Sequence, residues 1–350
     1  MLNSIYGIKP QDLSSFIAEH FPAYRARQLL DWIYDKLIFD PDEMSNLPKD
    51  FKQWLTDSFD FSLPQILALD LSKDGTKKFL LELSDGKRIE CVIIPEGKKN
   101  TLCLSSQTGC ARGCSFCATG TMGPGRNLLP HEIMQQVLIA SKEVCPERIT
   151  NIVFMGMGEP MDNLDNVLET LLLLQDEQGL SFSPRRTTIS TCGVLPGITK
   201  LANSKVKVKL AVSLNSAIDK VRDELMKVNI AFPLEPLKRA LKYFNSQNPF
   251  RITFEYILIP EVNMDDAAIQ ALKRFTSDLA AKINFIPYNP VASLPYRSPT
   301  DAEVEDFMAR AASLPQAITL RRSRGRDIHG ACGQLATKTT KQTEKGEPHE

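Results

Sequence analysis

The sequence lacks several features that would assign it to other classes of protein. None of its apolar runs approaches the roughly 20 residues of a membrane-spanning helix, and its start, Met1 to Lys9, has no signal-peptide pattern. Its formal net charge of zero gives no overall sign of a polyanionic partner. Eight cysteines, unevenly spread over 350 residues, do not make a disulfide scaffold. We therefore expect a cytoplasmic protein without membrane contact, whose cysteines serve metal binding or catalysis.

Three of these cysteines, Cys110, Cys114 and Cys117, lie together in a glycine-containing segment with the spacing C-x3-C-x2-C. Three thiolates at this spacing can bind three irons of a four-iron cluster. The fourth iron then has no protein ligand, and it can hold a small molecule and deliver an electron to it. The alternatives are a structural zinc site or unrelated core thiols. Zinc usually needs a fourth His or Cys at short range, which this segment does not offer.

The charges are unevenly distributed along the chain. Residues 1–60 hold 6 Lys and Arg against 10 Asp and Glu, so the basic surplus lies further on. One basic run contains Arg321, Arg322, Arg324 and Arg326, and Arg185 with Arg186 forms a second. Such runs can bind phosphates, and they occur equally often at solvated strand ends and loops.

The first hundred residues predict helices followed by a β-hairpin. Residues 11–60 have helical patterning, with Asp12 expected to cap the first helix. From Ile66 to Ile94 the apolar residues alternate, and Asp85-Gly86 provides a hairpin turn between two extended runs.

From about residue 100 onward, short apolar strands alternate with helices. The expected strands are 101–105, 151–155, 187–191, 209–214, 252–259, 283–287 and 318–321. The expected helices lie near 131–144, 164–176, 197–203, 217–226, 234–246, 264–280 and 301–313. This order predicts a parallel sheet covered by helices, either open or closed into a barrel. Function then belongs at the carboxyl ends of the strands, where the cysteine segment falls.

A second motif accompanies the cysteines. The apolar strand that starts at Asn151 ends in Gly156-Met157-Gly158-Glu159-Pro160. Gly158 would let the backbone approach a cofactor, and Glu159 would offset positive charge on it, although a Gly-Glu-Pro turn alone is more often only a loop. Together with the cysteine triad and Phe116, this pattern resembles the radical S-adenosylmethionine (SAM) superfamily. The resemblance implies an α/β fold with a partial (β/α)6 TIM-like barrel, a [4Fe-4S] cluster on the three cysteines, and SAM as cofactor.

Two more cysteines narrow the resemblance. Cys103 precedes the triad by seven residues, and Cys332 follows the C-terminal basic run; each alone would be read as structural. With Tyr24 to Gln28 upstream, they make the chain similar to the adenine C2 methyltransferases of ribosomal and transfer RNA, the RlmN/Cfr family, over about residues 6–336. The expected domains are a helical accessory domain at 1–61, a β-hairpin extension at 62–95, the radical SAM core at 96–335, and a disordered tail at 336–350.

The resemblance also implies catalytic roles. One SAM would methylate Cys332, and a radical from a second SAM would take a hydrogen atom from that methyl group. The resulting carbon would add to adenine, and Cys103 would attack the sulfur of Cys332, releasing the RNA and leaving a transient disulfide. Glu90 matches the residue that accepts the C2 proton.

The same comparison implies the contacts to SAM. They are Gly158, Glu159, Ser190, Ser213, Leu214, Asn215 and Asn289. Asn215 departs from the family, which often has His there, and Ser or Asn at a strand end equally serves to terminate the strand.

The implied partners are 23S rRNA, tRNA and an electron donor such as flavodoxin, with the protein expected to act as a monomer. Two alternatives remain open. The first is methylation at adenine C8, against which Pro160 is a modest indication because C8-specific relatives tend to have Ala there. The second is a non-catalytic RNA-binding protein stabilised by an iron–sulfur cluster or zinc. Cys91, Cys145 and Cys192 have no assigned role.

Overall fold

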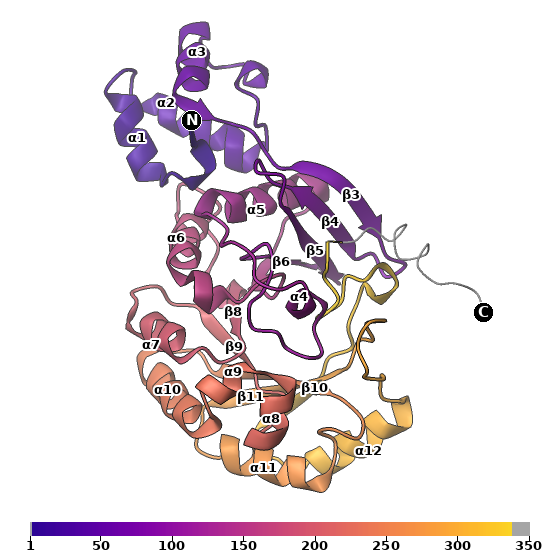
Figure 1. Cartoon of the computed structure of the whole chain (residues 1–350). Helices are drawn as coiled ribbons and strands as arrows, with labels where there is room; N and C mark the ends of the chain where they lie inside the picture. The colour runs from indigo at the N-terminus through magenta and orange to yellow at the C-terminus, as the bar shows by residue number, and fades with distance from the viewer. Residues whose placement is uncertain (1, 338–350) are drawn as a thin grey trace, which may run out of the picture.

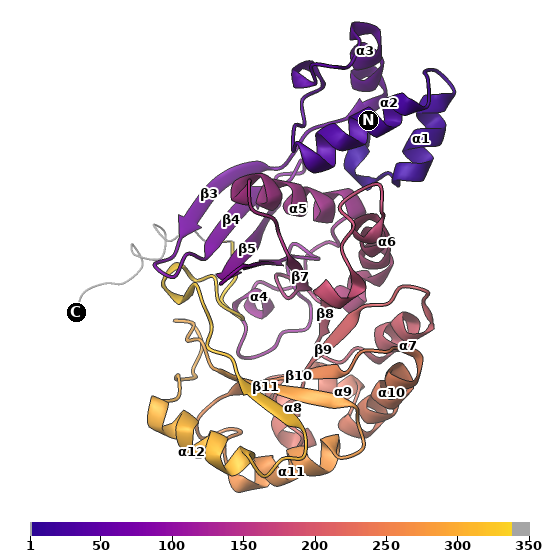
Figure 2. The same cartoon turned by 180° about the vertical axis from the view of Figure 1, so that it is seen from behind.

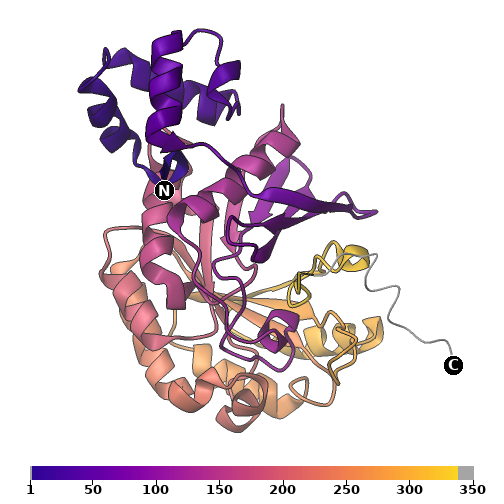
Figure 3. The ribbon, with the colours of Figure 1, turned by 45° about the horizontal axis from the view of Figure 1, so that its top comes forward.

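A computed structural model describes residues 2–337. The N-terminal part is helical and lies at one end of the molecule (Figures 1 and 3). It contains helices α1 (Pro10–Ala18), α2 (Tyr24–Leu30) and α3 (Lys49–Ser58) and the paired parallel strands β1 (Asn3–Ser4) and β2 (Phe59–Asp60). The expectation that Asp12 caps the first helix is wrong. Helix α1 begins at Pro10, whose fixed φ suits the first helical position, and Asp12 lies inside the first turn.

A single ten-stranded sheet forms the rest of the molecule, with the order β12-β11-β10-β9-β8-β7-β6-β5-β4-β3. Strands β6 to β12 are all parallel: β6 (Lys99–Cys103), β7 (Asn151–Phe154), β8 (Thr187–Thr191), β9 (Lys209–Ser213), β10 (Ile252–Leu258), β11 (Ala281–Pro287) and β12 (Ala317–Leu320). The order is linear, so the described strands form an open barrel. The predicted partial (β/α)6 barrel is confirmed, and β12 adds a seventh strand at its edge.

Helices connect the parallel strands and cover the outer face of the sheet, as Figure 2 shows for α6, α7, α10 and α11. They are α5 (Pro130–Val144), α6 (Leu164–Gln175), α7 (Leu195–Asn203), α8 (Asp219–Leu225), α9 (Val228–Ala231), α10 (Leu234–Gln247), α11 (Asp266–Thr276) and α12 (Asp301–Ala311). The predicted alternation of strands and helices is therefore confirmed, with boundaries that differ by a few residues. Among the described residues no helix is both long and apolar enough to span a membrane.

The predicted hairpin is also present, and it joins the barrel. Strands β4 (Lys77–Glu82) and β5 (Arg88–Glu96) pair antiparallel, and the backbone N–H of Leu83 donates to the carbonyl of Lys87 at 2.8 Å to close the turn. Strand β3 (Gln65–Leu71) pairs with β4, and β5 pairs with β6. The three antiparallel strands thus extend the barrel sheet beyond β6.

Side chains alternate between the two faces of the barrel strands. On β10 and β11, the aromatic rings of Tyr256 and Phe285 pack against Phe307 of α12, with ring centroids 6.4 and 5.1 Å from it. The residues that precede these aromatic residues on each strand point to the other face and are polar. Glu255 of β10 is in register with Ser213 on β9 and with Asn284 on β11. The outer face of the sheet therefore carries the apolar core, and the inner face carries polar groups.

Candidate active site

A cavity of about 150 Å³ lies among the carboxyl-terminal parts of the barrel strands. Its walls bring together nine of the residues singled out from the sequence: Cys110, Cys114, Cys117, Gly158, Glu159, Ser190, Ser213, Asn215 and Cys332. These residues come from segments more than 200 positions apart in the chain. Their convergence is a property of the fold, since neighbouring parallel strands end at the same edge of the sheet.

The cysteine loop is folded tightly on itself. The backbone N–H of Cys110 donates to the carbonyl of Gly123 at 2.8 Å, and a Cβ added to Gly125 would lie 2.2 Å from the backbone nitrogen of Gly109. Only glycine permits so close an approach of two backbones. Arg112, inside the loop, forms an ion pair with Asp162 beyond β7. The short helix α4 (Ala118–Thr121) follows Cys117 directly and lies within the curve of the sheet (Figure 1).

The three thiols have the chemistry that an iron–sulfur cluster requires. All three are free, partly buried and on the wall of the same cavity. Burial raises the pKa of Cys110 to about 11, and it also raises the pKa of Cys114 and Cys117, so metal binding would have to release their protons. Within residues 2–337 no three His, Cys, Asp or Glu side chains converge on a point suited to one metal ion. In a cluster each thiolate binds a different iron, so convergence on one point is not needed.

Gly158 and Glu159 connect the ends of two strands. Gly158 has φ +99°, and a Cβ there would lie 2.6 Å from the Cβ of Gln107. The buried carboxylate of Glu159 accepts hydrogen bonds from the backbone N–H groups of Met161, at 3.0 Å, and Cys192, at 2.8 Å. Burial raises its pKa, while these hydrogen bonds oppose the rise. Both oxygens are thus engaged by the protein itself, and the carboxylate ties the end of β7 to the end of β8.

The remaining expected SAM contacts differ in their placement. Ser190 and Ser213 lie on the cavity wall at the ends of β8 and β9. Asn215 lines the cavity with φ 56°, and its side-chain oxygen accepts the backbone N–H of Ile257 at 2.9 Å. Leu214 is fully buried and does not line the cavity.

Asn289 is placed against the Cys332 loop instead of on the cavity wall. Its side-chain nitrogen donates to the carbonyl oxygen of Cys332 at 3.1 Å and to the hydroxyl of Ser323 at 2.9 Å. The amide of Asn289 therefore holds the Cys332 loop through these hydrogen bonds.

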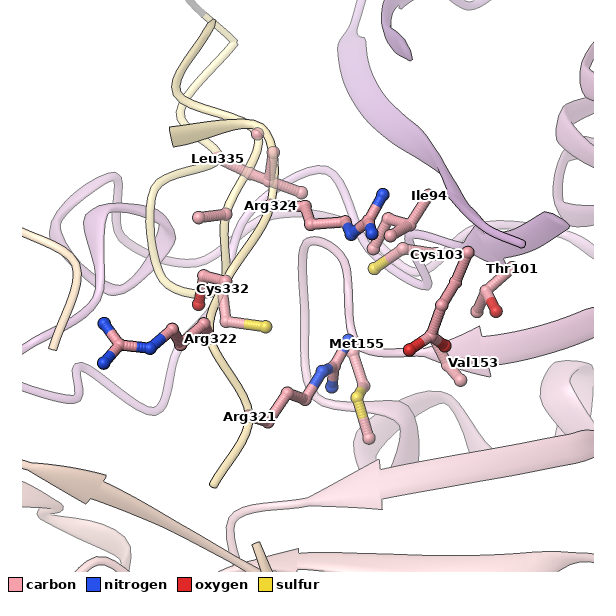
Figure 4. A pocket seen from close by; sticks show the side chains of 14 residues that line it. Ile94, Thr101, Cys103, Val153, Met155, Arg321, Arg322, Arg324, Cys332 and Leu335 are labelled. Carbon is pink, nitrogen blue, oxygen red and sulfur yellow. The ribbon is translucent and has the colours of Figure 1, made fainter. Parts of the chain in front are cut away.

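A second cavity, of about 110 Å³, contains Cys103 and Cys332 together. Their sulfurs point toward one another across it, Cys103 from the end of β6 and Cys332 from the C-terminal loop (Figure 4). Burial, with a smaller contribution from Cys332, raises the pKa of Cys103 to about 12, and the positive charge of Arg321 opposes the rise. Since Cys332 also lines the first cavity, this residue borders both spaces.

The Cys332 loop is anchored to the antiparallel extension. The carboxylate of Asp327 accepts hydrogen bonds from the Ser72 hydroxyl at 2.5 Å and the Lys73 backbone N–H at 3.1 Å. At the other end, the carbonyl of Gly333 accepts the backbone N–H of Ala118, directly after the cysteine triad, at 2.7 Å. These contacts position Cys332 between the two cavities.

Glu90 lies in the sheet behind the loop and lines neither cavity. It is fully buried on β5, one carboxylate oxygen is 3.2 Å from the ammonium of Lys78, and the other accepts the backbone N–H groups of Ala336 at 2.8 Å and Thr337 at 3.1 Å. Burial raises its pKa, and Lys78 opposes the rise. Ala336 and Thr337 belong to the expected tail, of which residues 338–350 lie outside the described residues.

Sequence reasoning missed several residues of the first cavity, including Arg112, Met155, Thr191, Glu255 and Arg321. Arg321 was noted only as part of a basic run. Glu255 carries the stronger signal, because a carboxylate in the middle of a mostly apolar, buried strand must face a polar interior or a ligand.

Comparison with known proteins agrees with this geometry. Residues 104–271 match the Radical SAM superfamily, and residues 3–60 match the Ribosomal RNA large subunit methyltransferase N-terminal domain. The fold superimposes on the crystal structure of a radical SAM methyltransferase from Sphaerobacter thermophilus with a TM-score of 0.92 and 37% identity, covering 96% of this chain and 100% of that one. The fold and the three-cysteine cavity thus define a radical SAM methyltransferase.

The particular family follows from relatives over nearly the whole length. The chain is 42% identical over 332 residues to the dual-specificity RNA methyltransferase RlmN of Desulfotalea psychrophila, covering 92% of this chain and 91% of the relative. It is 41% identical over 333 residues to the corresponding protein of Nitratiruptor sp., covering 91% and 94%. The chain belongs to the RlmN family of dual-specificity RNA methyltransferases.

Proposed function

We propose that the protein methylates carbon 2 of an adenine in 23S rRNA and in tRNA, with a [4Fe-4S] cluster and SAM as cofactors. One observation carries the proposal: Cys332 lines both the three-cysteine cavity and the cavity that holds Cys103. A thiol that first receives a methyl group beside the cofactor and later exchanges with a second thiol must be accessible from both sides.

Cys110, Cys114 and Cys117 would hold the cluster, and Ser190, Ser213 and Asn215 would face SAM. When bound there, the cluster and SAM supply the ability to abstract a hydrogen atom from an unactivated methyl group. A one-electron donor such as flavodoxin would reduce the cluster. Carbon 2 of adenine has no lone pair with which to attack a sulfonium methyl group, and so the reaction needs this radical route.

Cys332 would carry the methyl group to the base. Cys103, as a thiolate, would then attack the Cys332 sulfur, forming an S–S bond as the C–S bond to the RNA breaks. The methylene carbon on the base keeps the electron pair of that bond and takes up a proton to become the methyl group. Burial keeps Cys103 as a thiol at neutral pH, with a pKa of about 12. A thiolate buried in this cavity would be costly, so the thiol form of Cys103 suits the resting enzyme. The thiolate is needed only once the adduct exists.

Glu90 would accept the C2 proton. The backbone of Ala336 and Thr337 occupies one of its oxygens, and so the segment after Cys332 has to move before the base can reach this carboxylate. The target adenosine must also leave its stack to enter the cavity, as for other enzymes that act on a base. Ribosomal and transfer RNA as substrates would place the reaction in the cytoplasm, and we expect a monomer to suffice.

Mass spectrometry of nucleosides tests the proposal directly. Reconstituted enzyme, dithionite and SAM should convert adenosine to 2-methyladenosine in 23S rRNA and tRNA that lack the modification, and Cys332→Ala should make none. The product 8-methyladenosine would establish the C8 alternative. Wild-type enzyme that forms neither methylated nucleoside nor 5′-deoxyadenosine would favour a non-catalytic RNA-binding protein.

A further inference from the structure

Three residues line both cavities: Met155, Arg321 and Cys332. They mark the junction of the two spaces, and Arg321 is the charged residue among them. Its backbone is fixed at the end of β12, where the Arg321 N–H donates to the carbonyl of Phe285 at 2.8 Å. Its side chain extends toward Met155, below the sulfur of Cys332 (Figure 4).

The guanidinium of Arg321 is not committed to another group. It is half-buried, and it forms neither a hydrogen bond nor an ion pair within residues 2–337. Its neighbours in the basic run are occupied differently. Arg322 pairs with Asp301 at 2.8 Å, and Arg324 donates to the carbonyl of Pro95 at 2.6 Å. A half-buried guanidinium whose donors are unused is expensive unless a ligand completes its hydrogen bonds.

The surroundings of Arg321 retain this positive charge. The Cys332 sulfur raises the pKa of Arg321 above its usual range, and Glu255 adds to the rise. Glu255 is 7% exposed and lines the first cavity; Asn284 donates to one of its oxygens at 3.1 Å, while the other oxygen is buried with no hydrogen-bond partner among the described residues. A donor and an acceptor, both unsatisfied, therefore face the same space beside Cys332.

The reaction places one chemical group at this junction. Carbon 2 of the target adenine has to come within bonding distance of the carbon carried by Cys332, and it lies between N1 and N3, each with a lone pair in the ring plane. Arginine is a donor only and stays charged at any working pH. A donor held at a ring nitrogen beside C2 withdraws electron density from the ring and stabilises the charge that develops when a bond forms at C2.

We propose that Arg321 is a catalytic residue that contacts the target adenine by donating a hydrogen bond to N1 or N3. The inference rests on the proposed function. In this inference Arg321 recognises and activates the base. The methylation of Cys332, which precedes base entry, does not depend on this side chain.

Enzyme reconstituted with its cluster tests the inference in single turnover, with Arg321→Met and Arg321→Lys and with Arg322→Met as the matched control. The substrate is a 23S rRNA fragment that carries adenosine, 1-deazaadenosine or 3-deazaadenosine at the methylated position. On adenosine, Arg321→Met should lower the rate of RNA methylation by about 100-fold. Arg321→Lys should recover part of the loss, and Arg322→Met should stay within about 3-fold of the wild type.

The deaza substrates identify the atom. Replacing the ring nitrogen that Arg321 contacts should slow RNA methylation by the wild type. On that substrate, Arg321→Met should lower the rate by less than about a further 3-fold. The methyl group on Cys332, measured by mass spectrometry of the protein before RNA is added, should be present in every Arg321 variant. This readout also shows that the variants are folded and bind SAM.

Two results would overturn the inference. In the first, Arg321→Met lowers the rate of RNA methylation by the same factor on all three substrates. In the second, Arg321→Met and Arg321→Lys both fail to methylate Cys332. Either would place Arg321 with the cofactor or with Cys332. A wild-type enzyme that methylates Cys332 but no RNA would contradict the proposed function instead, and so the two failures are distinguishable.

Discussion

The carboxylate of Glu90 accepts the backbone N–H of Ala336 at 2.8 Å and so joins strand β5 to the segment that follows Cys332. The same carboxylate is a partner of the buried ammonium of Lys78, at 3.2 Å. One side chain thus has two structural contacts besides its proposed part in proton transfer, and loss of activity on its removal would not by itself prove a catalytic role.

Substitution of Glu90 should therefore separate anchoring from chemistry. Glu90→Ala should destabilise the protein by about 3 kcal/mol, because it removes a carboxylate from a buried ion pair. It should also speed hydrogen exchange in peptides covering residues 331–337. Glu90→Gln, which can still accept one N–H, should retain most of the protection and lose RNA methylation. Glu82→Ala, at a partly exposed pair with Arg88, is the control and should cost less than about 0.5 kcal/mol. Unchanged exchange in Glu90→Ala would contradict the anchoring role.

Gly158 should tolerate no side chain. Gly158→Ala places a Cβ 2.6 Å from that of Gln107 at φ +99°, so the turn after β7 must move. We expect SAM binding to weaken by about tenfold or more, measured by equilibrium dialysis. Gly86→Ala, at φ +75° in the open hairpin turn, has the same kind of strain without a clash. It should cost about 1 kcal/mol of stability and leave SAM binding unchanged. Equal SAM affinities in the two variants would argue against the close approach.

Asn289 distinguishes a cofactor contact from a loop anchor. Its amide holds the carbonyl of Cys332 at 3.1 Å. Asn289→Ala should therefore slow the methylation of Cys332 by about tenfold while changing SAM affinity by less than about 3-fold. The opposite pattern, weak SAM binding with normal methylation of Cys332 at saturating SAM, would restore the cofactor contact implied by the resemblance.

Much of the fold could be predicted from the sequence because its signals are local. Alternating apolar strands and helices predicted a parallel sheet covered by helices, and Asp85-Gly86 predicted the hairpin. The partial barrel was implied by the resemblance, and the spacing of the triad predicted an iron–sulfur cluster. The cap at Asp12 failed because Pro10 starts the helix earlier, a preference as local as the one that was used. The pairing of β5 with β6, which joins the extension to the barrel, depends on strand order and is not encoded in either strand.

The site was predictable in its residues more than in its contacts. Cys103 and Cys332 share a cavity although 229 positions separate them, and only the resemblance connected them. Glu159 was expected to offset cofactor charge, but its oxygens accept hydrogen bonds from the backbone of Met161 and Cys192. Such partners are main-chain groups set by the ends of neighbouring strands, and no residue pattern identifies them. Arg321 was not singled out from its basic run because a charged run does not reveal which of its members turns inward.

The pKa of Cys103 predicts a pH dependence for the release of RNA. Burial raises that pKa to about 12, so the thiolate is a minor species at neutral pH and its fraction grows tenfold with each pH unit below 12. The rate at which a preformed adduct resolves should therefore rise about 100-fold between pH 7 and pH 9. Quenching at set times and gel electrophoresis measure this rate. The methylation of Cys332, measured in parallel, is the control. A resolution rate that levels off below pH 8 would mean that the bound adduct activates Cys103.

The central claim is that one thiol, Cys332, carries the methyl group from the cofactor cavity to RNA and is released by Cys103. Isolation of the Cys103→Ala protein after expression tests it most directly. The account predicts RNA covalently attached at Cys332. Nuclease should trim this RNA to a modified adenosine, which mass spectrometry should locate on that residue. The Cys103→Ala, Cys332→Ala double variant should carry no RNA. Cys103→Ala protein that contains an intact iron–sulfur cluster and a methylated Cys332 but no attached RNA would contradict it.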